Sequence, residues 1–172
     1  LEQGLGAWVE HEAKIVANLW DTMAAPIFRR SAVPPAPTLP MSKQLNVHAL
    51  GQVFTPAAVV ERMLALRQRR GRSLDPAAGD GAFSRRINGC EAIEIDAAVA
   101  PPGARVMDFF ALPLTEKFDT VIGNPPYVRQ QDIPPETLAR LDSALFDGRS
   151  NLYLYFIEKA VRHLRRGGEL IF

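Results

Sequence analysis

Apolar residues after position 50 follow two spacings that alternate along the chain. Short apolar runs bounded by turn residues predict buried strands at 73–75, 92–95, 105–107, 120–122 and 169–172. Stretches with an apolar residue at every third or fourth position separate several of these runs and predict amphipathic helices. Strands that alternate with helices predict an α/β fold, a doubly wound and mostly parallel sheet with right-handed crossovers.

Capping and turn residues mark the ends of the predicted helices. Thr55 suits an N-cap and Pro56 a first helical position, and an apolar stripe follows them as far as Leu64. A short helix is predicted near residues 81–87. A long helix with one apolar face is predicted over residues 152–166, where the glycine pair 167–168 stops it.

Residues 1–40 follow a different pattern. Apolar residues at helical spacing, among them Trp8, Leu19 and Trp20, predict an amphipathic helix over residues 5–24. The proline-rich stretch 33–40 predicts a stiff, extended linker. Because a methionine follows at position 41, we expect residues 1–40 to be an extension or a vector-derived segment and residues 41–172 to form the main domain.

Composition narrows the class of protein. A chain of 172 residues that is 47% hydrophobic and 23% charged is long enough for one globular domain with a core. Its net charge of +1 gives no bulk attraction to nucleic acid. Cys90 is the only cysteine, which excludes an intrachain disulfide and fits the reducing cytoplasm. No apolar run approaches the roughly 20 residues that span a membrane, so no membrane partner is expected.

The loop after the fourth predicted strand, Gly123-Asn124-Pro125-Pro126-Tyr127, carries the clearest chemical signal. The prolines stiffen the backbone and lack an N–H, so the Asn124 side-chain oxygen and the Pro125 carbonyl are offered as acceptors. Tyr127 adds a flat ring beside them. Two acceptors and a stacking ring suit a planar group that bears an –NH2, such as adenine. The alternative is an ordinary proline-rich turn in which Asn124 is a cap or forms an Asx-turn.

Polar residues also follow the other predicted strands. Asp75 opens a run of small residues, 75–82, where a ligand can approach the backbone closely. Glu94 lies near the end of the second strand, where α/β folds bind ribose hydroxyls. The third strand ends in Asp108 and Phe109, which can accept from an amine and pack on a purine.

Each of these residues also has an ordinary structural explanation. Asp75 can cap a helix, Glu94 can be a surface charge, and Phe109 and Phe156 can be core residues. Their shared placement favours a site, because the carboxyl ends of parallel strands meet at one edge of a sheet.

Four segments, taken in order, resemble a known enzyme family. Residues 75–83, Asp-Pro-Ala-Ala-Gly-Asp-Gly-Ala-Phe, resemble motif I of the N6-adenine methyltransferases that use S-adenosylmethionine, and Asn-Pro-Pro-Tyr at 124–127 resembles their catalytic motif. Residues 51–56 resemble motif X of the gamma class, and residues 151–168 are similar to the segment after the catalytic loop. Over residues 48–172 the order resembles that of TaqI-like modification methylases of restriction-modification systems. The resemblance implies a Rossmann-like class I methyltransferase fold, truncated after the fifth strand.

The resemblance implies roles in binding S-adenosylmethionine. Thr55 contacts the methionine carboxylate of the cofactor, and Asp75 lies near its ammonium group. Ala77 and Gly79 form the wall that the cofactor approaches closely, and Glu94 binds the ribose hydroxyls.

The adenine of the cofactor is the second part of the implied cofactor site. Asp108 accepts a hydrogen bond from the adenine amine, and Phe109 and Phe156 sandwich the adenine ring.

The same resemblance implies a catalytic role for the loop at 124–127. Asn124 and Pro125 accept the two hydrogens of the target amine, which frees the nitrogen lone pair to attack the sulfonium methyl group. Pro126 completes the motif, and Tyr127 stacks on an adenine that has been flipped out of the DNA duplex. No metal is required.

Three alternatives remain open from the sequence. The chain can be an RNA adenine methyltransferase or a protein-glutamine N-methyltransferase, which shares Asn-Pro-Pro-Tyr but usually carries a Gly-x-Gly-x-Gly motif I. It can also be an inactive cofactor-binding fragment. The resemblance implies double-stranded DNA as partner, bound through a target-recognition domain that the family places after this region. The open sheet edge and the helix at 5–24 predict self-association.

Overall fold

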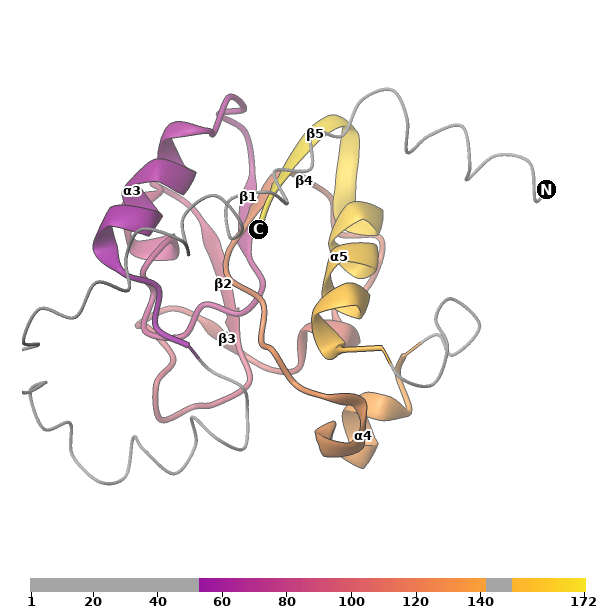
Figure 1. The fold of residues 1–172 in the computed structure, drawn as a ribbon. Coiled ribbons are helices and arrows are strands. Elements are labelled where there is room, and N and C mark those ends of the chain that lie inside the picture. The colour runs from indigo at the N-terminus through magenta and orange to yellow at the C-terminus, as the bar shows by residue number, and fades with distance from the viewer. Residues whose placement is uncertain (1–52, 142–149) are drawn as a thin grey trace, which may run out of the picture.

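A parallel sheet organises the part of the chain that the computed structural model describes, residues 53–141 and 150–172 (Figure 1). Its strand order is β3-β2-β1-β4-β5, and every pairing is parallel. The strands are β1 (Ser73–Asp75), β2 (Glu91–Glu94), β3 (Arg105–Val106), β4 (Phe118–Ile122) and β5 (Leu164–Ile171). The prediction of a doubly wound parallel sheet is confirmed. The helix predicted at 5–24 and the boundary at residue 40 lie outside the described residues.

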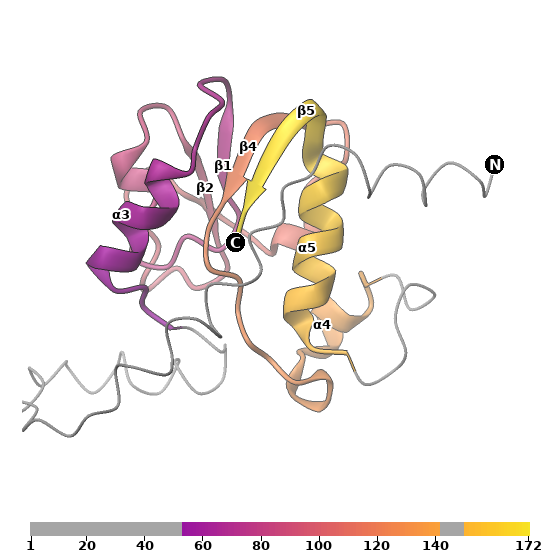
Figure 2. The same ribbon diagram turned by 45° about the horizontal axis from the view of Figure 1, so that its top comes forward.

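Helices cover both faces of the sheet (Figures 1 and 2). α3 (Ala57–Ala65) lies on one face and α5 (Leu152–His163) on the other. Side chains alternate along a strand, so β4 supplies both cores: Val121 packs in the α5 cluster and Ile122 in the α3 cluster. The helices in the described ranges are too short or too polar to cross a bilayer.

The remaining elements are short. They are the four-residue helix α4 (Pro135–Leu138) and three single 3₁₀ turns, η1 (Ser84–Arg86), η2 (Phe109–Ala111) and η3 (Gln130–Asp132). The short helix predicted near 81–87 is therefore reduced to η1. Gly81 accounts for part of this difference, because it has φ +86°, a conformation that leaves the right-handed helix.

The start of α3 differs from the prediction by one position. Pro56 is the N-cap, with φ −58° and ψ 141°, and the first helical residue is Ala57. No side chain caps this helix. The hydroxyl of Thr55, predicted to be the cap, instead accepts a hydrogen bond from Asn124.

The end of α5 was also predicted wrongly. The helix stops at His163, and Leu164 already pairs with Phe118 of β4. Gly167 and Gly168 do not end the helix but lie inside β5, where the pairing with β4 shifts register and Gly167 has φ +72°. A Cβ on Gly168 would lie 3.0 Å from the Arg165 carbonyl oxygen, so this bulge requires glycine.

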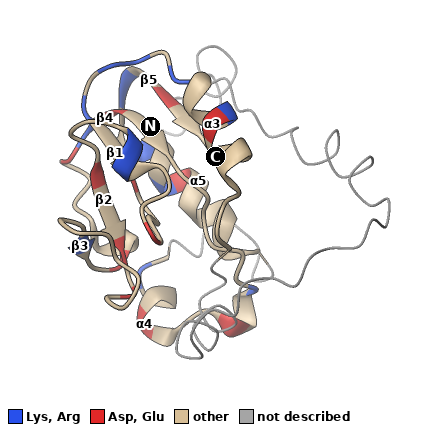
Figure 3. Ribbon diagram, turned by 90° about the vertical axis from the view of Figure 1, so that its left-hand side faces the viewer, with Lys and Arg blue, Asp and Glu red and all other residues tan. Residues whose placement is uncertain are grey.

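Glu169 connects β5 to the loop after α3 and to β4. These contacts lie at the end of the sheet opposite to Glu94, Asp108 and Asn124. Figure 3 shows basic residues gathered there, on the loop after α3 and at the start of β5. The Glu169 carboxylate accepts hydrogen bonds from the backbone N–H of Gln68 (2.9 Å) and Arg69 (2.8 Å) and from the hydroxyl of Thr120 (2.8 Å). One side chain thereby joins β5, β4 and the loop after α3.

Replacing Glu169 by alanine should lower the free energy of unfolding by about 1.5–3 kcal/mol, because three donors lose a charged acceptor at once. Urea unfolding measures this change. Glu61→Ala is the matched control, since Glu61 is exposed on α3 and pairs with Arg86 at the surface; its effect should stay within about 0.5 kcal/mol. An equal decrease in the free energy of unfolding in the two variants would contradict the stabilising role of Glu169.

Candidate active site

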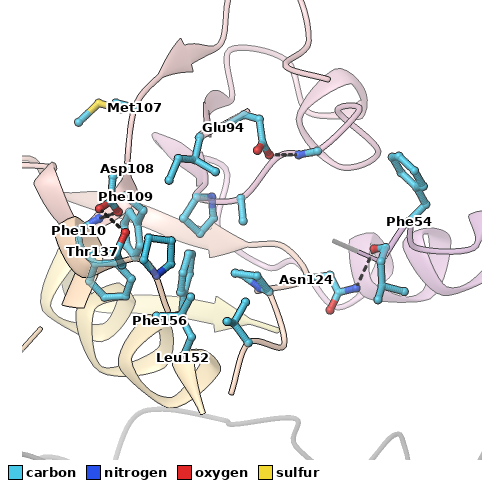
Figure 4. Close-up of a pocket in the computed structure, with 18 residues that line it drawn as sticks. Phe54, Glu94, Met107, Asp108, Phe109, Phe110, Asn124, Thr137, Leu152 and Phe156 are labelled. Carbon is cyan, nitrogen blue, oxygen red and sulfur yellow. Dashed lines mark hydrogen bonds between the residues drawn. The ribbon is translucent and has the colours of Figure 1, made fainter. Parts of the chain in front are cut away.

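The carboxyl ends of the strands border one pocket, which encloses about 810 Å³ including space open to solvent (Figure 4). Many of the residues predicted for a site line it: Ala77, Gly79, Glu94, Asp108, Phe109, Asn124, Pro126 and Phe156. Thr55, Asp75, Pro125 and Tyr127 do not line it. The segments from four strand ends therefore meet in one cavity, as their order along the chain predicted.

The lining is apolar and acidic. Two carboxylates, those of Glu94 and Asp108, face a wall of aromatic and aliphatic side chains, and the described lining residues include no Lys, Arg or His. A cationic ligand with an aromatic body and several hydrogen-bond donors fits such a lining better than a phosphate-bearing one. S-adenosylmethionine has these properties, because it combines a sulfonium, an ammonium, ribose hydroxyls and an adenine.

Glu94 is held at the pocket wall by the backbone. The residue is buried, with 3% of its surface exposed, although its side chain is ionisable. Its carboxylate accepts from the N–H of Gly79 at 2.7 Å and from the N–H of Asp96 at 2.9 Å. Gly79 has φ +55°, which favours glycine, and an added Cβ there would meet no protein atom within 4 Å. The predicted close-approach wall and the predicted ribose-binding acid are thus joined by one hydrogen bond.

Asp108 is engaged by three donors of the protein. One carboxylate oxygen accepts from the N–H of Phe110 at 2.8 Å, as the N-cap of η2. The other accepts from the Thr137 hydroxyl at 3.1 Å and from the Arg140 guanidinium at 3.2 Å. Thr137 belongs to α4, which was not predicted. These contacts fix the carboxylate at the same side of the pocket as Phe109 and Phe110 (Figure 4).

The predicted sandwich of Phe109 and Phe156 is not open in this structure. Their ring centroids are 5.1 Å apart with planes at 33°, so the rings touch each other and leave no slot for a third ring. Phe109 and Phe156 belong to the same core cluster under α5, so the sandwich stays a prediction that requires these rings to separate. Apolar surface for a planar ligand is offered instead by Ile95, Val128 and Pro134, which the sequence did not single out.

Lys159, on α5, stabilises the η2 turn through its ammonium group. Its ammonium donates to the carbonyl oxygens of Phe110 at 2.7 Å and Leu112 at 3.1 Å. Partial burial lowers the pKa of Lys159. The sequence showed only a lysine on the polar side of a helix, so this role could not be inferred without the fold.

Asn124 is oriented by the segment before α3. Its amide nitrogen donates to the Thr55 hydroxyl at 3.2 Å and to the Val53 carbonyl at 3.4 Å (Figure 4). A primary amide has two N–H donors, so both are used, and the carbonyl oxygen is the part of this side chain that remains an acceptor. Together with the backbone oxygen of Pro125, the loop supplies acceptors, as the sequence predicted.

Tyr127 forms a stack with Tyr153. The ring centroids are 5.9 Å apart with planes at 19°, and Tyr127 is 44% exposed. Tyr153 lies in the first turn of α5, whose N-cap Asn151 accepts from the Tyr153 N–H at 3.1 Å. One face of the Tyr127 ring is therefore covered by a second aromatic side chain, whose role the sequence did not indicate.

Asp75 lies beneath the pocket and does not line it. The residue is fully buried, and one carboxyl oxygen accepts from the Ser84 N–H at 3.2 Å. The other oxygen has no hydrogen-bond partner in the described part of the chain, and a Cβ on Gly123 would lie 3.0 Å from it. Burial raises the pKa of Asp75 to about 7. This environment differs from the predicted contact with a cofactor ammonium group.

The chain has a Rossmann-like class I methyltransferase fold. Its strand order fits this fold, as does the acidic and apolar pocket at the carboxyl edge of the parallel sheet. The fold is similar to that of a modification subunit of a candidate type I restriction enzyme from Vibrio vulnificus YJ016, with a TM-score of 0.52 at 17% identity over 72% of this chain and 33% of that one.

The sequence model of the Eco57I restriction-modification methylase family matches residues 85–172. The chain therefore belongs to this family, and S-adenosylmethionine is its expected cofactor. The Type II methyltransferase M.TthHB8I of Thermus thermophilus is 37% identical over 158 residues, which are 79% of this chain and 36% of that protein. M.HincII of Haemophilus influenzae is 31% identical over 137 residues, or 72% of this chain and 27% of that protein. The chain thus spans about a third of the length of these relatives or less.

The buried Asp75 predicts a distinctive pH dependence of stability. Its pKa rises from 3.8 to about 7, so the native state retains a proton that the unfolded chain releases between these values. This group therefore makes the protein less stable as the pH rises from about 4 to about 7. In Asp75→Asn the titration is lost, and the unfolding free energy of the variant should rise relative to wild type by up to about 1.4 kcal/mol per pH unit in this window.

Urea unfolding of both proteins at several pH values measures that difference. A difference that stays constant from acid to neutral pH would show that Asp75 titrates normally.

Proposed function

We propose that this chain belongs to a DNA methyltransferase that transfers a methyl group from S-adenosylmethionine to the N6 amine of a flipped-out adenine. The matched relatives are about three times as long as the region they share with this chain, or longer. The activity of a complete enzyme, including binding of duplex DNA, is therefore part of the proposal.

The orientation of the Asn124 amide is the observation that carries this proposal. Because Val53 and Thr55 take both amide hydrogens, the side chain can offer its oxygen but not its nitrogen to a substrate. The carbonyl of Pro125 is a second acceptor, and neither Pro125 nor Pro126 has an N–H. A pair of acceptors suits a substrate group that can donate two hydrogen bonds. An –NH2 group has two such hydrogens, whereas a hydroxyl has one and a ring carbon has none.

These acceptors also explain how the amine becomes reactive. The lone pair of adenine N6 is delocalised into the ring, so the nitrogen is a poor nucleophile. Hydrogen bonds from both N6 hydrogens to fixed acceptors draw the nitrogen toward tetrahedral geometry and localise the lone pair. Because the acceptors are already oriented, no reorganisation is needed as positive charge develops on nitrogen. The N–CH3 bond forms as the S–CH3 bond breaks, S-adenosylhomocysteine leaves, and N6 then gives up one proton to solvent.

The pocket residues are suited to hold the cofactor beside this loop. S-adenosylmethionine, when bound, supplies an electrophilic methyl group on a positively charged sulfur. In this proposal Glu94 accepts from the ribose hydroxyls and Asp108 from the adenine amine, while Ile95 and Phe109 offer apolar surface to the ligand. The absence of cationic side chains from the described lining avoids repulsion of the sulfonium.

The exposed Tyr127 supports an unpaired base as the target. Its ring is backed by Tyr153 on one side, and stacking of a base on such a ring contributes about 1–3 kcal/mol. A base inside a duplex cannot reach a recessed amine acceptor, so it must rotate out of the helix. The residues 41–172 form the catalytic region in this proposal.

The nature of the methylated product tests the proposal. Full-length protein is incubated with S-adenosylmethionine labelled in the methyl group and with unmethylated bacteriophage DNA, which offers every short sequence many times. The DNA is then digested to nucleosides for mass spectrometry. N6-methyladenine is the expected product. Label in N4-methylcytosine, in RNA added as competitor, or in a protein glutamine would refute the adenine-DNA assignment.

Asn124→Ala should reduce the single-turnover rate of methyl transfer by about 10²–10³-fold, the usual effect of losing one group that stabilises developing charge. Binding of S-adenosylhomocysteine, measured by calorimetry, should change little, because the loss belongs to the transition state. A near-normal rate in this variant would remove Asn124 from the chemistry.

Glu94→Gln should weaken binding of S-adenosylhomocysteine by about 10- to 100-fold, because a charged acceptor of ribose hydroxyls becomes a neutral amide. Calorimetry measures the dissociation constant. Glu61→Gln makes the same chemical change at an exposed position on α3 and should bind normally. Unchanged affinity in Glu94→Gln would exclude this carboxylate from the cofactor site.

A further inference from the structure

The segment that leads into α3 accepts hydrogen bonds from the loop at 124–127 and does not cap its own helix. Thr55 precedes Pro56 and was suited to cap α3, yet no side chain caps that helix. Its hydroxyl oxygen lies 3.2 Å from the amide nitrogen of Asn124. The carbonyl oxygen of Val53 accepts from the same nitrogen at 3.4 Å.

We infer that Thr55 is a positioning residue that acts through Asn124: its hydroxyl holds the Asn124 side chain beside the Val53 carbonyl, which determines the end of the amide that faces the substrate. This inference rests on the proposed function, in which the Asn124 oxygen accepts from the target amine. It assigns to Thr55 a role in the chemical step that is separate from contact with the cofactor.

The physical need for such a residue follows from the symmetry of an amide. The terminal torsion of asparagine has two broad minima that exchange the oxygen and the nitrogen. In the exchanged orientation, the –NH2 of Asn124 would face the –NH2 of the substrate, and two donors cannot bond to each other. The Asn124 oxygen would then face the Val53 carbonyl, which has no hydrogen to donate, whereas the Thr55 hydroxyl can bond either end of the amide. The orientation is therefore fixed only while the Asn124 side chain is held beside Val53, and this is the contribution of Thr55.

Asn124 cannot fix this orientation from within its own loop. The next two residues are prolines, so they have no N–H that could bond the amide oxygen in either orientation. Within the described residues, the side chain of Asn124 donates its hydrogen bonds to Val53 and Thr55. Because Val53 contributes its backbone, Thr55 is the partner that a side-chain substitution can remove.

The experiment is a double-mutant cycle on the single-turnover rate, with saturating S-adenosylmethionine and unmethylated bacteriophage DNA as substrate. Thr55→Val keeps the shape of the side chain and removes the hydroxyl, whereas Thr55→Ser keeps the hydroxyl. Thr115→Val is the matched control, since Thr115 is exposed in the loop before β4. Thermal unfolding of each variant shows that the fold is retained.

Thr55→Val should slow methyl transfer by about five- to tenfold, the effect of one lost hydrogen bond. Thr55→Ser should recover the rate to within about twofold, and Thr115→Val should match wild type. In an Asn124→Ala background, Thr55→Val should cause no further loss, because the group on which it acts is already gone.

The outcomes separate this inference from the proposed function. If Asn124→Ala keeps its full rate, both fail. If Asn124→Ala is slow but Thr55→Val transfers methyl at the normal rate, only the positioning role of Thr55 is overturned. The same conclusion follows if Thr55→Val slows the Asn124→Ala variant by the same factor as it slows wild type. A Thr55→Val variant that binds S-adenosylhomocysteine weakly, yet transfers methyl at the normal rate when saturated, also overturns it.

Discussion

The pairing of β1 with β4 is the constraint on which the rest of the structure depends. Leu74 lies opposite Val121, both without solvent exposure, and the chain leaves the two strands toward opposite sides of the sheet. A crevice opens where connections diverge in this way. It receives the small-residue loop after β1 on one side and the Asn-Pro-Pro-Tyr loop after β4 on the other. In the proposed function, the cofactor and the target amine can meet because these two strands are neighbours.

Much of this arrangement could be predicted from the sequence, because it depends on local patterns. The strand positions follow from short apolar runs, and the predicted ends of β1, β2 and β3 lie within one residue of those observed. Parallel pairing then places Glu94, Asp108 and Asn124 at one edge without further information. The acceptor character of the loop at 124–127 also follows from its prolines alone.

The remainder depends on contacts between segments far apart in the chain. Leu164 begins a strand because Phe118 offers a partner, which outweighs the helical pattern of its neighbours. Phe109 and Phe156 touch because α5 packs over η2, and the sequence could not show how close they would come. The role of Thr137 depends on α4, a single turn too short to leave a periodic pattern, and that of Thr55 on a loop much later in the sequence.

The contact between Gly123 and Asp75 links two positions that belong to different motifs. A methyl group added at Gly123 would lie 3.0 Å from a carboxyl oxygen of Asp75, which is fully buried. A larger residue at position 123 therefore requires the Asp75 side chain to shift by a few tenths of an ångström. Directed evolution of this candidate site would do better to randomise positions 75 and 123 jointly, because a change at one position alters the space available at the other.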